Sequence, residues 1–181
     1  GFKIPWANEY DRSIHATYEA NHTGTFLERR SLNDFGPSEL PDDISGMIGG
    51  PPCQSWSEAG MLRGAEDVRG QLFFRYVEFV AKVKPAFFLA ENVSGILFRR
   101  HAEAFQEILK KFCDLGYNVS YGLVNANDYG VPQDRERVFI VGYRLKGDVF
   151  FRPPDVDAKR KVLKDAIWDL RKSAKPALGK T

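Results

Sequence analysis

Apolar runs that fit β-strands alternate along this chain with segments of helical periodicity. Residues 2–8 and 43–50 are short strand-like runs, and residues 86–92 form a nearly continuous apolar run. Such a run is typical of a central strand in a parallel sheet. Residues 118–126 and 137–145 alternate apolar and polar side chains, which predicts two further strands. This order of elements predicts an α/β fold, a layered sheet with crossover helices.

Three segments between the strands have side chains at helical spacing. They are residues 11–22, which begin at the candidate N-cap Asp11, residues 71–84, and residues 102–116, which end at Gly116. Cys113 follows the buried face of the third helix, so we expect it to be a small apolar residue of the core. In the first segment, Ile14, Tyr18 and Asn21 lie near helical spacing. The predicted inner faces of the second and third are Leu72, Phe73, Tyr76, Phe79, Val80 and Val83, and Phe105, Ile108, Leu109, Phe112 and Leu115.

Length and charge narrow the picture only slightly. The 181 residues suit one domain with its own core. The 26 Lys and Arg against 24 Asp and Glu give a net charge of +2, which neither requires nor excludes a polyanionic partner. We find no apolar run long enough to span a bilayer and no signal peptide pattern, and two cysteines make no disulfide framework. We therefore expect a cytoplasmic protein with no membrane partner.

Three polar clusters follow predicted strands, at the edge where open α/β sheets bind their ligands. They are Pro52-Cys53-Gln54, Glu91-Asn92-Val93 and residues 133–137. The prolines before Cys53 make a rigid corner that could present the thiol, but a free thiol of pKa about 8.5 needs an activating neighbour. From the residues alone, a nucleophile and a structural turn cysteine both stay open for Cys53.

Two other chemistries fit the residues poorly. The three histidines, His15, His22 and His101, stand in no context typical of a Cys-His hydrolase. Two cysteines without paired spacing offer no zinc ligand set, so no metal site is expected.

Taken together and in this order, the clusters resemble the conserved blocks of the DNA cytosine-5 methyltransferases. "GGPPCQSWS", "AENV" and "PQDRERVFIVG" carry the resemblance, and "ANEYDRSIHATYEANH" is similar to the family's block for the cofactor's ribose and adenine. The resemblance implies a Rossmann-like fold that uses S-adenosyl-L-methionine, with a mostly parallel sheet, flanking helices and a C-terminal antiparallel hairpin. It also implies a bacterial, cytoplasmic enzyme of a restriction-modification system that acts on double-stranded DNA.

The resemblance assigns catalytic roles to four residues. Cys53 would add to carbon 6 of cytosine, which makes carbon 5 nucleophilic, and Glu91 would share a proton with ring nitrogen 3. Arg137 would hold the carbonyl oxygen of the base, and Arg135 would support the pocket or Cys53. The alternatives are a strand-end salt bridge for Glu91 and an ion pair with Glu136 or Asp134 for Arg137.

The target base must leave the stacked duplex, so the site needs a cover and contacts to DNA. Residues 55–70 follow Cys53 without strong periodicity, and we expect them to form a lid, with an ordinary surface loop as the alternative. The residues expected to contact DNA are Gln54, Ser55, Ser57, Arg63, Arg69, Asn92 and Gln133.

For the cofactor, the resemblance points to Glu9 for the ribose hydroxyls and to Tyr10 for the adenine face. The alternatives are a charge at a helix start and a partly buried tyrosine. Pro52 and Leu72 would line the same pocket. Ser31 stands where the family usually has an Asp that accepts from the adenine amino group, so this contact departs from the pattern.

Two family parts have no counterpart in the sequence: the Phe-x-Gly-x-Gly block and the small domain that reads DNA. We therefore expect residues 1–146 to be a partial catalytic domain, incomplete at both ends, and residues 147–181 to be a connector toward the DNA-reading domain. The absent parts could come from a separate chain, and the complete enzyme is expected to be a monomer. The alternative function is an inactive fragment, or a remnant that binds DNA or another partner.

Overall fold

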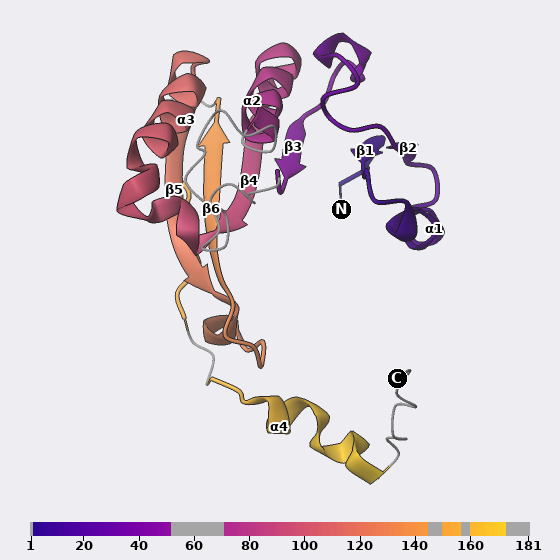
Figure 1. The fold of residues 1–181 in the computed structure, drawn as a ribbon, viewed down its shortest axis with the longest axis vertical. Helices are drawn as coiled ribbons and strands as arrows, with labels where there is room; N and C mark the ends of the chain where they lie inside the picture. The colour runs from indigo at the N-terminus through magenta and orange to yellow at the C-terminus, as the bar shows by residue number, and fades with distance from the viewer. Residues whose placement is uncertain (1, 52–70, 145–149, 157–159, 173–181) are drawn as a thin grey trace.

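The computed structural model describes residues 2–51, 71–144, 150–156 and 160–172, which form two sheets with helices around them (Figure 1). The larger sheet has the order β3-β4-β6-β5, and the smaller one pairs β1 with β2. The strands are β1 (Trp6–Asn8), β2 (Phe26–Glu28), β3 (Gly46–Gly49), β4 (Phe87–Val93), β5 (Asn118–Asn125) and β6 (Glu136–Tyr143).

Strand direction in the larger sheet confirms the expected α/β class. β3 and β4 are parallel, and β6 is antiparallel to both β4 and β5, so three of the four strands run in one direction. The predicted hairpin is β5-β6, and β6 inserts between β4 and β5 rather than at the edge. The central apolar strand β4 therefore has one parallel and one antiparallel neighbour, where the sequence suggested a parallel strand.

The main core lies between this sheet and helices α2 (Gln71–Val83) and α3 (Ala102–Asp114), which lie side by side in Figure 1. The aromatic ring of Phe88 on β4 stacks on Phe112 of α3 with a centroid distance of 4.0 Å. Gly142 must lack a side chain, because a Cβ there would lie 2.1 Å from the ring of Phe88. The side chains buried completely in this core include Phe73, Val80, Phe88, Ile96, Ile108, Phe112, Val138 and Ile140.

The predicted position of Cys113 in that core is wrong. Phe105, Ile108 and Phe112 face the sheet, and the next residue along a helix is rotated by about 100° from its neighbour, which turns Cys113 outward. The thiol is free and exposed.

The smaller sheet consists of β1 and β2, which pair in parallel, and helix α1 (Arg12–Asn21) lies between them in the sequence. Asp11 caps α1 as predicted and accepts a hydrogen bond of 2.9 Å from the Ser13 amide. The helix predicted from the spacing of Ile14, Tyr18 and Asn21 is present, but Ile14 is 42% exposed and the residue that α1 buries is His15. The strand β1 lies within the strand-like run predicted at residues 2–8, whereas β2 was not predicted.

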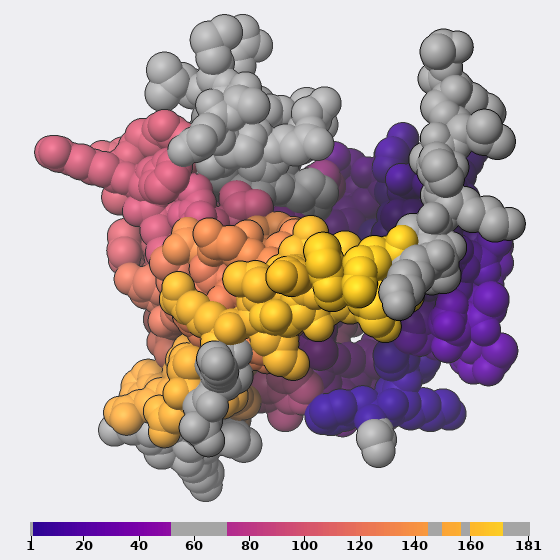
Figure 2. All heavy atoms as spheres, turned by 90° about the horizontal axis from the view of Figure 1, so that it is seen from below, coloured from indigo at the N-terminus to yellow at the C-terminus, as the bar shows by residue number. Residues whose placement is uncertain are grey.

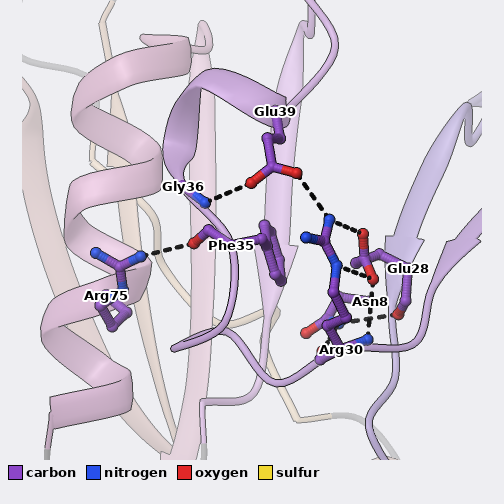
Figure 3. A network of polar contacts seen from close by, with 7 residues as sticks. All are labelled: Asn8, Glu28, Arg30, Phe35, Gly36, Glu39 and Arg75. Carbon is purple, nitrogen blue, oxygen red and sulfur yellow. Dashed lines mark hydrogen bonds and ion pairs between the residues drawn. The ribbon is translucent and has the colours of Figure 1, made fainter.

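The smaller sheet is held against α2 by the segment from Ser31 to Leu40. Phe35 stacks on Phe79 of α2 with ring centroids 5.3 Å apart. Arg75 of α2 donates to the carbonyl oxygen of Phe35 at 2.7 Å (Figure 3). It also donates to the carbonyl oxygen of Leu32 at 3.2 Å. One guanidinium group therefore binds this loop at two points.

The C-terminal segment leaves the end of β6 and passes along β5. The Phe151 amide donates to Ser120 Oγ at 2.9 Å, and Tyr129 donates to the Pro154 carbonyl at 3.1 Å. Helix α4 (Leu163–Ile167) and the 3-10 turn η5 (Trp168–Lys172) lie within residues 147–181, the expected connector. The division of the chain at residue 146 stays a prediction.

Within the described part of the chain, no helix has the length and apolar character needed to cross a membrane.

Candidate active site

Glu91 and Arg137 form an ion pair at the edge of the sheet where β3 and β4 end. Glu91 pairs in register with Phe139, and Val93 pairs with Arg137, so the two charged residues are diagonal neighbours on one face of β4 and β6. The Nε of Arg137 lies 2.7 Å from Oε1 of Glu91, with side chains 22% and 33% exposed. The pair is thus partly shielded from water but remains open to a ligand.

The guanidinium of Arg137 is oriented by a second contact. Its Nη1 donates to the backbone carbonyl of Glu136 at 2.7 Å. The sequence suggested that Arg137 could pair with the carboxylate of Glu136 or Asp134. In the structure it pairs with Glu91 instead.

The chain that leaves β3 passes directly beside this pair. A Cβ on Gly50 would lie 3.2 Å from Oε2 of Glu91, so glycine lets the backbone approach the carboxylate. Pro51 is buried, and its carbonyl accepts a hydrogen bond of 3.3 Å from the Asn92 amide. Cys53 follows Pro51 by two residues in the sequence, so the anchored backbone leads to the candidate nucleophile.

The side chain of Asn92 is used for this anchoring. It is 2% exposed, and its Oδ1 accepts from the Val93 amide at 2.9 Å while its Nδ2 serves Pro51. The structure therefore gives Asn92 a role in holding the backbone, and the substrate contact expected from the sequence stays a prediction.

The connection between β5 and β6 carries Gln133 and Arg135, both exposed, at the same edge of the sheet. Asn125 fixes this connection from its base. Its Oδ1 accepts from the amides of Asn127 at 3.0 Å and Arg135 at 3.1 Å, and its Nδ2 donates to Asp134. Sequence reasoning missed Asn125, although an Asn at the end of a strand before a turn is a known signal for such bonding.

The residues expected to hold the cofactor begin where β1 ends. The Glu9 amide donates to the Glu28 carbonyl at 3.0 Å, and Glu9 Oε1 accepts from the Asp11 amide at 2.7 Å. His15 Nε2 lies 2.8 Å from the carbonyl oxygen of Glu9, so this side chain of α1 holds the backbone that follows β1. Tyr10 is 69% exposed, so it is not the partly buried tyrosine of the alternative interpretation. A fixed carboxylate beside an open aromatic face fits a ribose and an adenine ring.

An ion-pair network supports the loop that carries Ser31 (Figure 3). Arg30 lies between two carboxylates, with Nη2 at 2.6 Å from Glu28 and at 2.8 Å from Glu39. Its hydrogen bond lowers the pKa of Glu28 to about 2, and both acids raise the pKa of Arg30. Asn8 adds hydrogen bonds to the carbonyls of Glu28 at 2.9 Å and Arg30 at 2.8 Å.

Ser31 itself uses its hydroxyl within the loop, where Oγ accepts from the Asn33 amide at 3.3 Å. Leu72 is half-buried in the first turn of α2. A hollow of about 360 Å³ lies near this loop, but its lining includes neither these two residues nor Glu9 and Tyr10. It is lined by Pro5, Trp6, Phe26, Glu28, Arg30, Phe35, Glu39, Leu40 and Pro41.

Several predicted site residues lie outside the described residues: Pro52, Cys53, Gln54, Ser55, Ser57, Arg63 and Arg69. The roles assigned to them, and the predicted lid over residues 55–70, stay predictions. Among the residues that the structure describes, no group of three or more His, Cys, Asp or Glu could hold a metal ion.

The fold is that of the S-adenosylmethionine-dependent methyltransferases, the class of the solved structures that match it. A crystal structure described as a DNA modification methyltransferase of an E. coli prophage matches with a TM-score of 0.72 and 28% identity, over 93% of this chain and 49% of that chain. The Dnmt2 methyltransferase of S. pombe matches with a TM-score of 0.61 at 18% identity, which shows the fold alone.

Residues 1–180 match the model of the C-5 cytosine-specific DNA methylase family, and the chain belongs to that family. It is 51% identical to the type II methyltransferase M.NgoPII of Neisseria gonorrhoeae, over 98% of this chain and 53% of that protein. It is 50% identical to M.FnuDI of Fusobacterium nucleatum, over 99% of this chain and 53% of that protein. The chain thus spans about half the length of these relatives.

Proposed function

We propose that this chain is the catalytic core of a DNA cytosine-5 methyltransferase, which transfers a methyl group from S-adenosyl-L-methionine to carbon 5 of a flipped-out cytosine in double-stranded DNA. The observation that carries the proposal is the Glu91–Arg137 pair beside Gly50 and Pro51. Ring nitrogen 3 and the carbonyl oxygen of cytosine flank one carbon atom. Two groups that bind both must be immediate neighbours, as this carboxyl and guanidinium are.

Each residue at the edge then has a defined task. The Cys53 thiolate adds to carbon 6 of the base, and the electrons move toward nitrogen 3, where Glu91 shares its proton. Arg137 donates to the carbonyl oxygen and keeps Glu91 in place. Once carbon 5 carries the methyl group, loss of its proton to a base releases the Cys53 thiolate from carbon 6. Asn92 holds Pro51, and through it the backbone that leads to Cys53.

The bound cofactor supplies the electrophilic methyl group that carbon 5 attacks. On this chain, the Glu9 carboxylate would accept from the ribose hydroxyls and Tyr10 would cover one face of the adenine. Ser31, Leu72 and Pro52 would complete that part of the pocket. We assign Arg135 to support of the pocket and Gln133 to the DNA, since both are exposed at the tip of the β5-β6 connection.

We propose GGCC as the recognition sequence and a bacterial restriction-modification system as the setting. Residues 48–70, 87–93 and 125–130 resemble blocks of the bacterial HaeIII methyltransferase, which modifies the inner cytosine of GGCC. The relatives reported above carry the names of other type II methyltransferases, so closeness to HaeIII stays a prediction.

The test is a covalent adduct with 5-fluorocytosine in a GGCC duplex. The fluorine at carbon 5 cannot leave as a proton does, so thiolate attack followed by methyl transfer leaves a denaturant-resistant product. The chain is mixed with S-adenosylmethionine and this duplex, with and without separate polypeptides for the parts of M.NgoPII that it does not cover. We expect an adduct that disappears in Cys53→Ala. A folded chain that forms none under any of these conditions contradicts the proposal.

The alternative function considered from the sequence is a chain that binds DNA or a partner without catalysis. DNA binding that is equal in the wild type and in Cys53→Ala, with no adduct in either, would identify this function.

A further inference from the structure

A rigid turn follows β4 and presents two arginines next to the proposed active site. The 3-10 turns η2 (Ser94–Leu97) and η3 (Arg99–His101) lead from β4 into α3. Ile96 is fully buried and His101 is 6% exposed, so the turn is anchored on both sides. The backbone bonds from Phe98 to Gly95 and from His101 to Phe98, at 3.1 and 2.8 Å, close it.

The outward residues of this turn are Phe98, Arg99 and Arg100, all exposed. Arg100 lies over the ring of Phe98, with the central guanidinium carbon 5.0 Å from the ring centroid. Its Nε donates to Nε2 of His101 at 3.0 Å. These contacts orient the guanidinium of Arg100, and the residue remains exposed.

No carboxylate neutralises this turn within the described part of the chain. Residues 92–102 contain no Asp or Glu, and the first acid beyond them is Glu103. None of the ion pairs between described residues includes Arg99 or Arg100. His101 does not compete for an anion either, because its burial and the charge of Arg100 lower its pKa and favour the neutral ring.

The turn belongs to the same edge of the sheet as the Glu91–Arg137 pair. Val93, the last residue of β4, is the register partner of Arg137, and η2 begins at the next residue. Figure 2 looks at this edge, and the pink surface after β4 adjoins the orange surface of the β5-β6 hairpin.

We propose that Arg99 and Arg100 bind the phosphate backbone of duplex DNA beside the target base. The inference rests on the proposed function, because that function brings a polyanion to this edge. Guanidinium groups bind phosphate oxygens through paired donors, and backbone contacts of this kind position a protein on DNA without reading its sequence. The turn lies outside the lid and the hairpin, so it provides an additional point of attachment.

The experiment measures the affinity of the chain for a GGCC duplex at salt concentrations between about 50 and 200 mM. The variant is Arg99→Gln with Arg100→Gln. The matched control is Lys82→Gln with Lys84→Gln, two exposed cations at the opposite edge, before β4 begins. Each phosphate contact contributes about 0.9 to the slope of log K against log salt, so we expect the arginine variant to reduce the slope by about 1 to 2 and the control to leave it unchanged.

A slope and an affinity that stay at wild-type values in the arginine variant overturn the inference. The variant Arg99→Lys with Arg100→Lys keeps both charges and should keep most of the slope; a loss as large as that of the glutamine variant would assign the effect to altered folding and also overturn it. Circular dichroism of each variant accompanies the titrations, and if the double glutamine variant does not fold, Arg99→Gln alone is used and must reduce the slope by about 1.

The 5-fluorocytosine adduct separates this inference from the proposed function. A wild type that binds DNA with the arginine-dependent slope but forms no adduct supports the inference and contradicts the catalytic proposal. An adduct together with a slope that the arginine substitutions leave unchanged supports the catalytic proposal and contradicts the inference. No binding of the wild type to the duplex at about 50 mM salt overturns both.

Discussion

The side-chain Nδ2 of Asn92 on β4 donates to the carbonyl oxygen of Pro51 at 3.3 Å. A buried side chain of β4 thus holds the backbone that follows the neighbouring strand β3. Side chains alternate between the two faces of a strand, so Glu91 and Val93 lie on the face opposite to Asn92. On that face Glu91 pairs with Arg137. Two consecutive residues thus have different partners: Asn92 anchors the backbone that leads to Cys53, and Glu91 forms the ion pair with Arg137.

Asn92→Ala should destabilise the chain and slow its chemistry. The substitution leaves the Pro51 carbonyl and the Val93 amide without their partner, which costs about 1 to 3 kcal/mol in the free energy of unfolding. We also expect the rate of adduct formation to fall by about tenfold, since misplacement of a reacting group slows catalysis. Urea unfolding and adduct kinetics measure both effects, with the exposed Asn33→Ala as control. Wild-type kinetics in Asn92→Ala would show that the anchor is not needed.

Glu91 and Arg137 should behave as one unit. We expect Glu91→Gln and Arg137→Met each to reduce the rate of adduct formation by about a hundredfold or more, because one loses the shared proton and the other a charged donor. The double variant should lose less than the sum of the two effects, since each residue orients the other. A double-mutant cycle on adduct kinetics measures the coupling. Strict additivity would mean that the ion pair has no part in the reaction.

The fold could be predicted largely from the sequence because its long elements have clear periods. The stripe of Phe105, Ile108 and Phe112 and the apolar run of β4 are each long enough to show their face. Short elements gave no such signal: β2 has three residues. Insertion of β6 beside β4 depends on pairing between distant strands, which no local pattern records.

The residues of the site could be predicted from local motifs, but the contacts between them could not. Glu91 and Arg137 carry recognisable motifs, but their contact depends on the register between β4 and β6. Asn92 looked like a ligand contact because polar residues at strand ends often are, and only its burial shows that it serves the backbone. Arg75 carried no motif at all, since its partners are carbonyl groups of a loop about forty residues away.

The free energy of unfolding should fall at low pH because of the ion pair between Arg30 and Glu28. The hydrogen bond from Arg30 lowers the pKa of Glu28 from 4.5 to about 2, so the unfolded chain binds a proton more readily. The contribution is therefore complete above pH 4.5 and is lost as the pH falls toward 2. Glu28→Gln should flatten this part of the profile in urea titrations at pH 5, 4 and 3, although Glu39 and Asp11, whose pKa values are also lowered, keep some of the slope.

Arg75→Met should release the segment from Ser31 to Leu40 from α2. Methionine keeps an apolar stem against Phe79 but cannot donate to the carbonyl groups of Leu32 and Phe35. We expect a loss of about 1 to 3 kcal/mol in the free energy of unfolding and faster proteolytic cleavage within residues 29–40, because the loop then opens without global unfolding. The control is Arg29→Met, which breaks an exposed ion pair with Glu19 and should cost less than about 1 kcal/mol. Cleavage at the wild-type rate in Arg75→Met would show that the stacked rings of Phe35 and Phe79 hold the loop without the arginine.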